Sequence, residues 1–247
     1  MKKYAFISAA CIIGSAMLLQ SCDVDGDDNM DILRPTAVVT VCPNDDGSFV
    51  MNLDNETVLV PVNMSKSPYD DKEVRALVNY TEVGTSAYGC DMRDVTVNWI
   101  DSIRTKLPVA TTENDDKAFG NDPIEIVADW VTVAEDGYIT LRIRTLWDGS
   151  RRPHELNLVT GVNPDDPFEM ELRHNADGDT YGEMGDALIA FNLNDLPGFD
   201  NTVKIKLRWR SFSGEKSTEL ELLMRPRQTT SPTESDRSLS TLNARII

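Results

Sequence analysis

The sequence predicts an all-β protein, in which a small closed barrel or meander precedes an antiparallel two-sheet sandwich. From residue 33 onward, apolar side chains recur at every second position, which is typical of strands with one buried face. Turn-forming residues such as Asp54–Glu56 separate these runs. Almost no stretch has the helical period of about 3.6 residues. The chain therefore divides into two β-rich blocks, at residues 33–107 and 123–227.

The first block contains five candidate strands, which are enough to close a small barrel or to form a meander. They are the β-branched run around Val39 and Val41, the short runs 49–51 and 58–60, and the longer segments 73–81 and 94–103.

A polar stretch at residues 108–122 interrupts the alternation and ends near Gly120 and Pro123. Its acidic and hydroxyl side chains cannot form a core, so we expect a linker between two domains.

The second block contains seven candidate strands, each with one apolar and one polar face, and this pattern predicts a two-sheet sandwich. Glu135–Tyr138 reads as the turn of a hairpin. The strands are expected at 124–128, 139–143, 154–158, 168–172, 187–193, 203–210 and 220–224.

The first 21 residues have the layout of an export signal. Lys2 and Lys3 precede an uncharged apolar run at 4–19, which is shorter than a bilayer span. Leu19-Gln20-Ser21-Cys22 then matches a lipobox. We therefore expect cleavage before Cys22, a diacylglycerol on its thiol and a further acyl chain such as palmitate on its amine. An ordinary cleaved signal that happens to end near a cysteine is the alternative.

Residues 22–32 form an acidic tether that cannot pack into a core. The run is similar to the surface-export signal of lipoproteins in a group of Gram-negative gut anaerobes, although any solvated spacer would also be polar. The expected location is the outer membrane, at the cell surface. At the other end, the Ser/Thr-rich stretch 228–247 is expected to be a disordered tail.

The formal net charge of −17 argues against nucleic acid and against electrostatic docking on anionic lipid. The membrane is therefore expected as a partner only through the lipid on Cys22. A protein or glycan ligand is compatible with the sequence but not specified by it, and no cofactor is indicated.

Cys42 and Cys90 remain in the first β-rich block after export. Outside the cytoplasm such a pair can form a disulfide, or the two can stay as buried free thiols. Both alternatives remain open from the sequence.

Recognisable catalytic patterns are missing: no nucleophile elbow, phosphate loop or zinc-protease helix is present. His154 and His174 share strand parity with Leu156 and Leu172, so both rings are expected at the core or its rim. Because zinc sites use three or four ligands, a lone histidine pair is not expected to bind metal. The acidic string Glu171–Asp179 departs from a calcium loop, since Arg173 stands at its first ligand position.

For two further patterns, the sequence favours a structural role over a binding role. One strand face carries four cations, Lys204, Lys206, Arg208 and Arg210. It could bind an anionic ligand, but Glu219 and Glu221 on the following strand can neutralise it, and this second interpretation is favoured. The four tryptophans Trp99, Trp130, Trp147 and Trp209 could form a sugar-stacking platform. Trp99 and Trp209, however, belong by parity to apolar faces and are expected in the core.

Taken in order, several strings resemble the NigD-like lipoproteins. These are the lipobox with its acidic tether, 76–81, 103–106, 122–126, 136–141, 154–156 and 173–179. The resemblance covers about residues 1–226. It implies an N-terminal OB-type β-barrel at 33–107 and a C-terminal β-sandwich at 123–227. The family is named for a member encoded in a bacteriocin operon and has no assigned biochemical role, so it implies no catalytic residues.

The sequence thus favours a non-enzymatic, lipid-anchored envelope protein that acts as a binding or accessory module. One alternative is a surface glycan hydrolase, which would need two carboxyl groups about 5–9.5 Å apart in one cleft. Another is an immunity or assembly partner of a second envelope protein.

Overall fold

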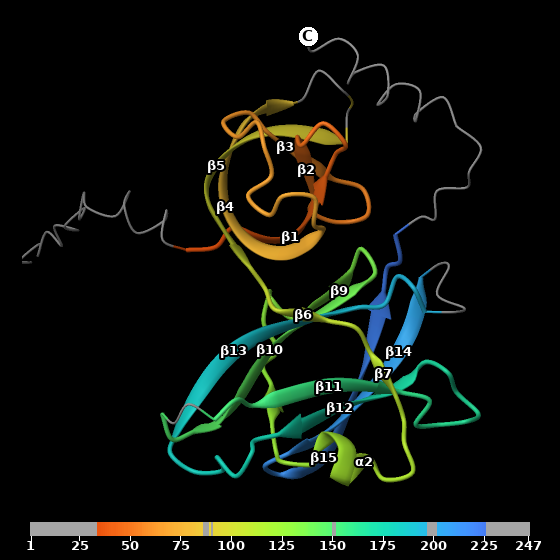
Figure 1. The fold of residues 1–247 in the computed structure, drawn as a ribbon. Coiled ribbons are helices and arrows are strands. Elements are labelled where there is room, and N and C mark those ends of the chain that lie inside the picture. The colour runs from red at the N-terminus through yellow and green to blue at the C-terminus, as the bar shows by residue number, and fades with distance from the viewer. Residues whose placement is uncertain (1–33, 86–88, 90, 150–151, 197–201, 226–247) are drawn as a thin grey trace, which may run out of the picture.

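A computed structural model describes residues 34–85, 89, 91–149, 152–196 and 202–225. The expected signal, lipidation site, acidic tether and tail lie outside these residues. The described chain forms two stacked β-domains, a barrel and a sandwich, as Figure 1 shows. This arrangement confirms the predicted fold class.

The barrel closes in the strand order β1-β2-β3-β5-β4, with β4 returning to pair with β1. All five strands expected in the first block are present. Their alternating apolar side chains, among them Val39, Met51 and Val95, fill the barrel interior. The strands are β1 (Ala37–Pro43), β2 (Phe49–Asn52), β3 (Val58–Pro61), β4 (Val74–Thr85) and β5 (Met92–Ser102).

The sandwich packs two sheets face to face, in the strand orders β6-β13-β10-β8 and β15-β14-β12-β11-β7, and β9 pairs with β10. Leu141, Phe191 and Leu207 belong to the apolar core of this domain. The strands of the first sheet are β6 (Thr105–Lys106), β8 (Glu125–Ile126), β9 (Val133–Glu135), β10 (Tyr138–Trp147) and β13 (Glu183–Asn192). Those of the second are β7 (Val109–Ala110), β11 (Glu155–Thr160), β12 (Glu169–Asn175), β14 (Val203–Ser211) and β15 (Gly214–Leu222).

The stretch 108–122, expected as a linker, contains two structured elements. Strand β7 pairs in parallel with β11, and helix α2 (Asp115–Phe119) begins at Asn114, whose side chain accepts the Lys117 N–H. Two-residue strands are too short to show a period, and the pairing of β7 depends on a strand some 50 positions away along the chain. Strands β6 and β7 therefore lead the chain from one sheet of the sandwich to the other.

The hairpin expected at Glu135–Tyr138 joins β9 to β10. Asp136 and Gly137 both have positive φ, of 50° and 75°, as a type I′ turn requires. A Cβ at Gly137 would lie 2.0 Å from Asn194 Oδ1, so this position has no room for a side chain.

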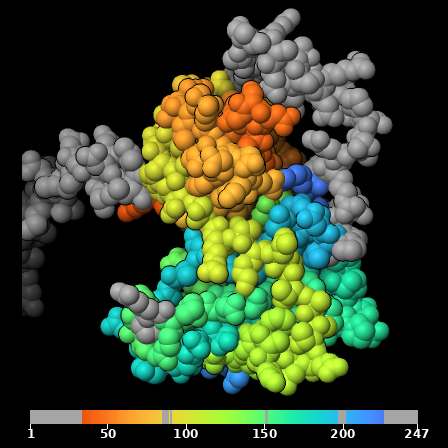
Figure 2. All heavy atoms as spheres, viewed as in Figure 1, coloured from red at the N-terminus to blue at the C-terminus, as the bar shows by residue number. Residues whose placement is uncertain are grey.

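The barrel sits on the outer face of the β10 sheet, and Figure 2 shows the two domains in contact. Arg75 of β4 is fully buried at this junction. Its guanidinium donates to Glu135 at 2.8 Å, and to the hydroxyls of Thr40 at 3.0 Å and Thr140 at 3.2 Å. It also lies over the Tyr138 ring, 5.7 Å from the centroid. The two domains therefore share a buried charge.

A second ionic group joins the barrel to the end of the sandwich. Arg225 pairs with Glu73 and with Asp136, both at 2.7 Å. The Tyr138 hydroxyl donates to Glu73 at 2.5 Å. These hydrogen bonds to Asp136 and Glu73 raise the pKa of Arg225 against the opposing effect of its burial. These ion pairs tie the end of the sandwich to the barrel, beside an apolar cluster in which Val38 of the barrel packs with Val131 and Ala190 of the sandwich.

No helix among the described residues is long and apolar enough to cross a bilayer.

Candidate functional site

The sandwich has an open side where the edges of β13 and β11 face each other. Strand β13 pairs with β6 only at Ala190 and Phe191, and β11 pairs with β7 only at Val159 and Thr160. A cavity of about 340 Å³ lies between the two edges. Its size falls in the range of small-molecule sites, which is about 300–1,000 Å³.

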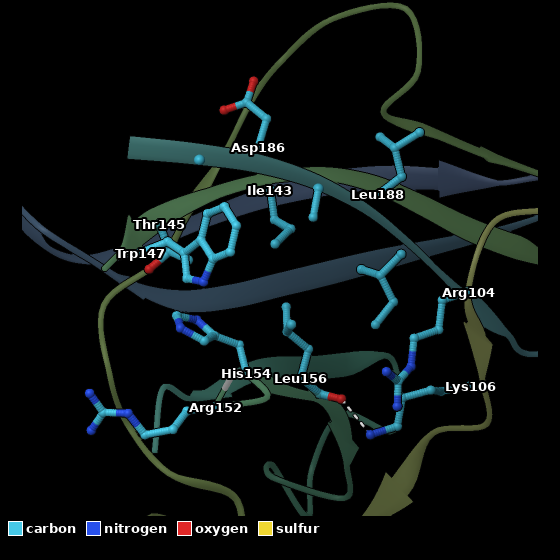
Figure 3. Close-up of a pocket in the computed structure, with 13 residues that line it drawn as sticks. Arg104, Lys106, Ile143, Thr145, Trp147, Arg152, His154, Leu156, Asp186 and Leu188 are labelled. Atoms are coloured by element: carbon cyan, nitrogen blue, oxygen red, sulfur yellow. Dashed lines mark hydrogen bonds between the residues drawn. The ribbon is translucent and has the colours of Figure 1, made fainter. Parts of the chain in front are cut away.

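The cavity has an apolar floor and an aromatic wall. Ile143, Leu156 and Ile189 line it from the inner faces of the two sheets. Trp147 follows Ile143 and Thr145 on the same face of β10 and is 52 % exposed, so its indole stands at the mouth (Figure 3). Strand alternation places these side chains, because every second residue of β10 points between the sheets.

Two cations lie at the end of the cavity nearest the barrel. Lys106 Nζ donates to Leu156 O and to Asn157 Oδ1, both at 2.7 Å (Figure 3 shows the first). Burial lowers the pKa of this lysine. Arg104 lies two residues earlier and also lines the cavity. Within the described ranges, neither side chain has a carboxylate within 4.0 Å, although the protein as a whole is strongly acidic.

Asp186 is the one carboxylate among the residues that line this cavity. Figure 3 shows it directed away from the cavity floor. It is held by Arg144 at 2.5 Å and also by Arg142, and these hydrogen bonds lower its pKa well below the usual range. Because glycoside hydrolysis needs two carboxyl groups, the lining of this cavity does not supply a hydrolase pair.

The two histidines meet at the opposite end of the cavity. His154 Nδ1 lies 3.0 Å from His174 Nε2, and His174 Nδ1 lies 3.3 Å from Pro123 O. His154 Nε2 lies 3.4 Å from Asp179 Oδ2. The prediction that both rings lie at the core or its rim is confirmed, because His174 is buried and His154 lines the cavity. Within the part of the chain that the structure describes, no group of three or more potential metal ligands forms a site.

Cys42 is a free cysteine and Cys90 lies outside the described residues, so their pairing stays a prediction. The Cys42 thiol donates to Thr40 O at 3.7 Å. Burial raises its pKa to about 12, which keeps the thiol protonated and unreactive.

The basic strand β14 has the expected register opposite β15, with Lys204 across from Glu221 and Lys206 across from Glu219. Its ion pairs, however, are formed with β12, the strand on the other side of β14 from β15. Lys206 and Arg208 bind Glu169 of β12, at 3.1 and 2.8 Å. Their hydrogen bonds, that of Arg208 foremost, lower the pKa of Glu169 to about 2. The parallel register of β12 and β14, which places Glu169 beside Lys206, explains the difference.

The tryptophans do not form one platform. Trp209 is buried in the sandwich core, as expected, whereas Trp99 is only half-buried. Trp130 and Trp147 are exposed and line two separate cavities.

Comparison with known families matches both domains. A model described as the NigD-like N-terminal OB domain matches residues 38–103, and one described as the NigD-like C-terminal beta sandwich domain matches 107–222. The chain belongs to the NigD-like family. The OB-type barrel implied by the sequence resemblance is confirmed.

Solved structures share the fold of this NigD-like protein. A toxin-related protein from Parabacteroides distasonis is 29% identical, with a TM-score of 0.61, and the match covers 84% of this chain and 97% of that one. A protein described as a NigD-like immunity protein from Bacteroides caccae is 19% identical, with a TM-score of 0.53, covering 74% and 90%. One described as a lipoprotein from Bacteroides fragilis is 12% identical, with a TM-score of 0.52, covering 78% and 98%. Comparison with curated proteins gives no significant match.

The likeness to the Bacteroides caccae and Bacteroides fragilis proteins shows that the three chains share one fold.

Sequence reasoning did not select Arg104, Lys106 and Trp147 as one site. The spacing of Arg104 and Lys106 places both on one strand face, which is a usable signal. Nothing local in the sequence indicates that this face borders an open edge of the sandwich.

Proposed function

We propose that this NigD-like protein is a lipid-anchored, non-catalytic binding protein of the outer membrane, displayed at the cell surface. The observation that carries the binding role is the cavity at the open side of the sandwich. It combines an apolar floor, an exposed indole and two cations without carboxylate partners in the described structure. Such a combination recognises a molecule with an apolar body and an anionic group.

The floor and the cations act on different parts of such a ligand. Ile143, Leu156 and Ile189 can cover an alkyl or ring body, which gains by leaving water. Arg104 and Lys106 are positioned for the anionic group. Lys106 is half-buried, which strengthens a charge-assisted hydrogen bond, whereas Arg104 is exposed. A carboxylate on a short aliphatic chain is the simplest probe of both features.

We expect decanoate to bind the purified domains, residues 34–225, about tenfold more tightly than decanol, because only decanoate engages the cations. Isothermal titration calorimetry measures both. Arg104→Gln is expected to remove most of this preference and leave decanol binding unchanged. The matched control is Arg93→Gln, since Arg93 is half-exposed on the barrel and paired with Glu82. Absence of decanoate binding, or an equal loss in both variants, would contradict the proposed ligand class.

The lipid anchor rests on the lipobox at Leu19–Cys22 and on the likeness in fold to a protein described as a lipoprotein. Several buried acyl chains give stable anchoring, since each CH₂ contributes about 0.8 kcal/mol. We expect Cys22→Ala to abolish incorporation of labelled palmitate and to release the protein from the membrane fraction. Protease added to intact cells is expected to cleave the wild-type protein. Cleavage only after the outer membrane is broken would place the protein in the periplasm instead.

An immunity or assembly role is the second candidate, and the neighbour described as a NigD-like immunity protein supports it. The open β13 edge offers a surface on which a partner strand can pair. Cross-linking from Met184, which is exposed on β13, tests this role in cells. A specific cross-linked protein would favour it, and a cross-link to no protein would argue against it.

A further inference from the structure

A continuous line of polar groups runs beside the cavity, from a carboxylate to a backbone carbonyl. Asp179 Oδ2 faces His154 Nε2 at 3.4 Å, His154 Nδ1 faces His174 Nε2 at 3.0 Å, and His174 Nδ1 faces Pro123 O at 3.3 Å. Asp179 and His174 are both buried, and the His154 side chain is 14 % exposed. Water therefore has little access to these contacts.

The number of protons in this line decides whether its contacts are satisfied. Its two ends, an ionised carboxylate and a carbonyl, are acceptors and bring no proton. Three contacts need three protons, but two neutral imidazoles bring only two. One contact is then a pair of facing acceptors, and the buried His154 Nε2 has no hydrogen-bond partner among the described residues. A buried unpaired polar atom is costly, so a third proton stabilises the line.

The geometry also locates the third proton. Pro123 O requires the His174 proton on Nδ1, so His174 Nε2 must accept from His154 Nδ1. The extra proton then lies on His154 Nε2, facing Asp179. The other oxygen of Asp179 accepts the Asp148 N–H at 2.9 Å, which fixes the carboxylate in place.

The charges around the pair favour one positive charge and oppose a second. Among the described residues, the loops packed against the rings carry the carboxylates Asp179, Asp148 and Asp122 and the cation Arg152, which pairs with Asp148 at 2.9 Å. Burial, together with the charge of His154, lowers the pKa of His174. His174 therefore stays neutral when His154 is charged.

We propose that Asp179, His154 and His174 form a proton-binding site that takes up one proton, held on His154, and thereby adds a positive charge to the wall of the sandwich cavity. His154 lines that cavity opposite Arg104 and Lys106. As pH falls and the site fills, an anionic ligand gains one more cation in the cavity wall, and by linkage the bound ligand strengthens proton uptake. Only this effect on ligand affinity rests on the proposed function.

The protonation state of the two histidine rings can be measured without any ligand. The chain has two histidines, so long-range ¹H–¹⁵N spectra of untagged, ¹⁵N-histidine-labelled protein contain two imidazoles to assign. Between about pH 8 and 5, one ring is expected to become doubly protonated while the other keeps a neutral Nδ1–H tautomer. Two neutral rings throughout, or two cationic rings at pH 5, would overturn the proposal.

Asp179→Asn tests the role of the carboxylate with little change of shape. The new amide can donate its own hydrogen to His154 Nε2, which completes the line without an extra proton. The proton affinity of the titrating ring is expected to fall at least about tenfold, a shift of one pH unit. Asp177→Asn in the same loop is the matched control, because Asp177 is exposed and asparagine tolerates its positive φ. Equal shifts in the two variants would count against the site.

Decanoate affinity measured at pH 8 and pH 6, where its carboxylate stays largely ionised, separates this inference from the proposed function. Tighter binding at pH 6 in the wild type, lost in Asp179→Asn, supports both. Decanoate that fails to bind at either pH refutes the ligand class, and the spectra alone then decide the proton site. Decanoate that binds equally at both pH values, beside a ring that titrates, refutes the link between them.

Discussion

Glu135→Ala is expected to lower the free energy of unfolding by about 3–5 kcal/mol, because it leaves a buried guanidinium without its carboxylate. Arg75 is fully buried between barrel and sandwich, and Glu135 is its one ion-pair partner among the described residues. A guanidinium cannot lose its proton to escape this cost. The hydroxyls of Thr40 and Thr140 remain, but they carry no opposite charge.

Arg75→Met is expected to cost less than Glu135→Ala. Methionine replaces the apolar stem of arginine, and the Glu135 side chain retains 22% exposure. Burial already raises the pKa of Glu135, so this carboxyl can take up a proton when its partner is removed. The two partners of one ion pair therefore contribute unequally to stability.

Urea unfolding of both variants measures this difference. The control is Glu82→Ala, which breaks the Arg93–Glu82 pair on the barrel surface, where the side chains are 48% and 50% exposed. Its expected cost is below about 1 kcal/mol, since water replaces the lost contact. Similar costs for Glu135→Ala and Glu82→Ala would show that the junction does not bury an isolated charge.

Phe191→Ala is expected to destabilise the protein by about 3–5 kcal/mol, through lost burial and the cavity left behind. Phe191 is fully buried on the inner face of β13, in the core that joins the two sheets. Strand β13 is paired with β10 along its whole length, so the backbone has little freedom to collapse into the space.

Phe212→Ala is the matched control, because the same side chain is removed from a site that is 40% exposed. Its expected cost is about 1 kcal/mol or less. Both variants are compared by thermal and urea unfolding. A Phe191→Ala protein as stable as Phe212→Ala would mean that the sheets repack around the gap.

Much of the fold follows from local pattern. A strand that buries one face must alternate apolar and polar residues, so the five barrel strands and the main sandwich strands could be located from their period. The hairpin before Tyr138 was predictable for a related reason, since Asp-Gly is among the dipeptides that adopt a type I′ turn most readily. Strands β6 and β7 are too short to carry a period.

The charged contacts were not predictable in the same way. Lys206 faces Glu219 in the hairpin register, yet its ion pair is with Glu169, 37 residues earlier in the chain. The sequence brings Glu219 near through a short turn, but only the sheet order brings β12 beside β14. Arg75 and Glu135, 60 residues apart, likewise meet only because the barrel docks on the sandwich.

For the candidate site, the sequence by itself determined that His154 and His174 point toward the core or its rim, because strand parity fixes the face on which a side chain lies. Only the tertiary structure decided that the two rings meet Asp179, and that Trp147, Arg104 and Lys106 border one cavity. These groups come from strands and loops far apart in the chain. Their proximity depends on which strand edges remain open, and no local pattern encodes that.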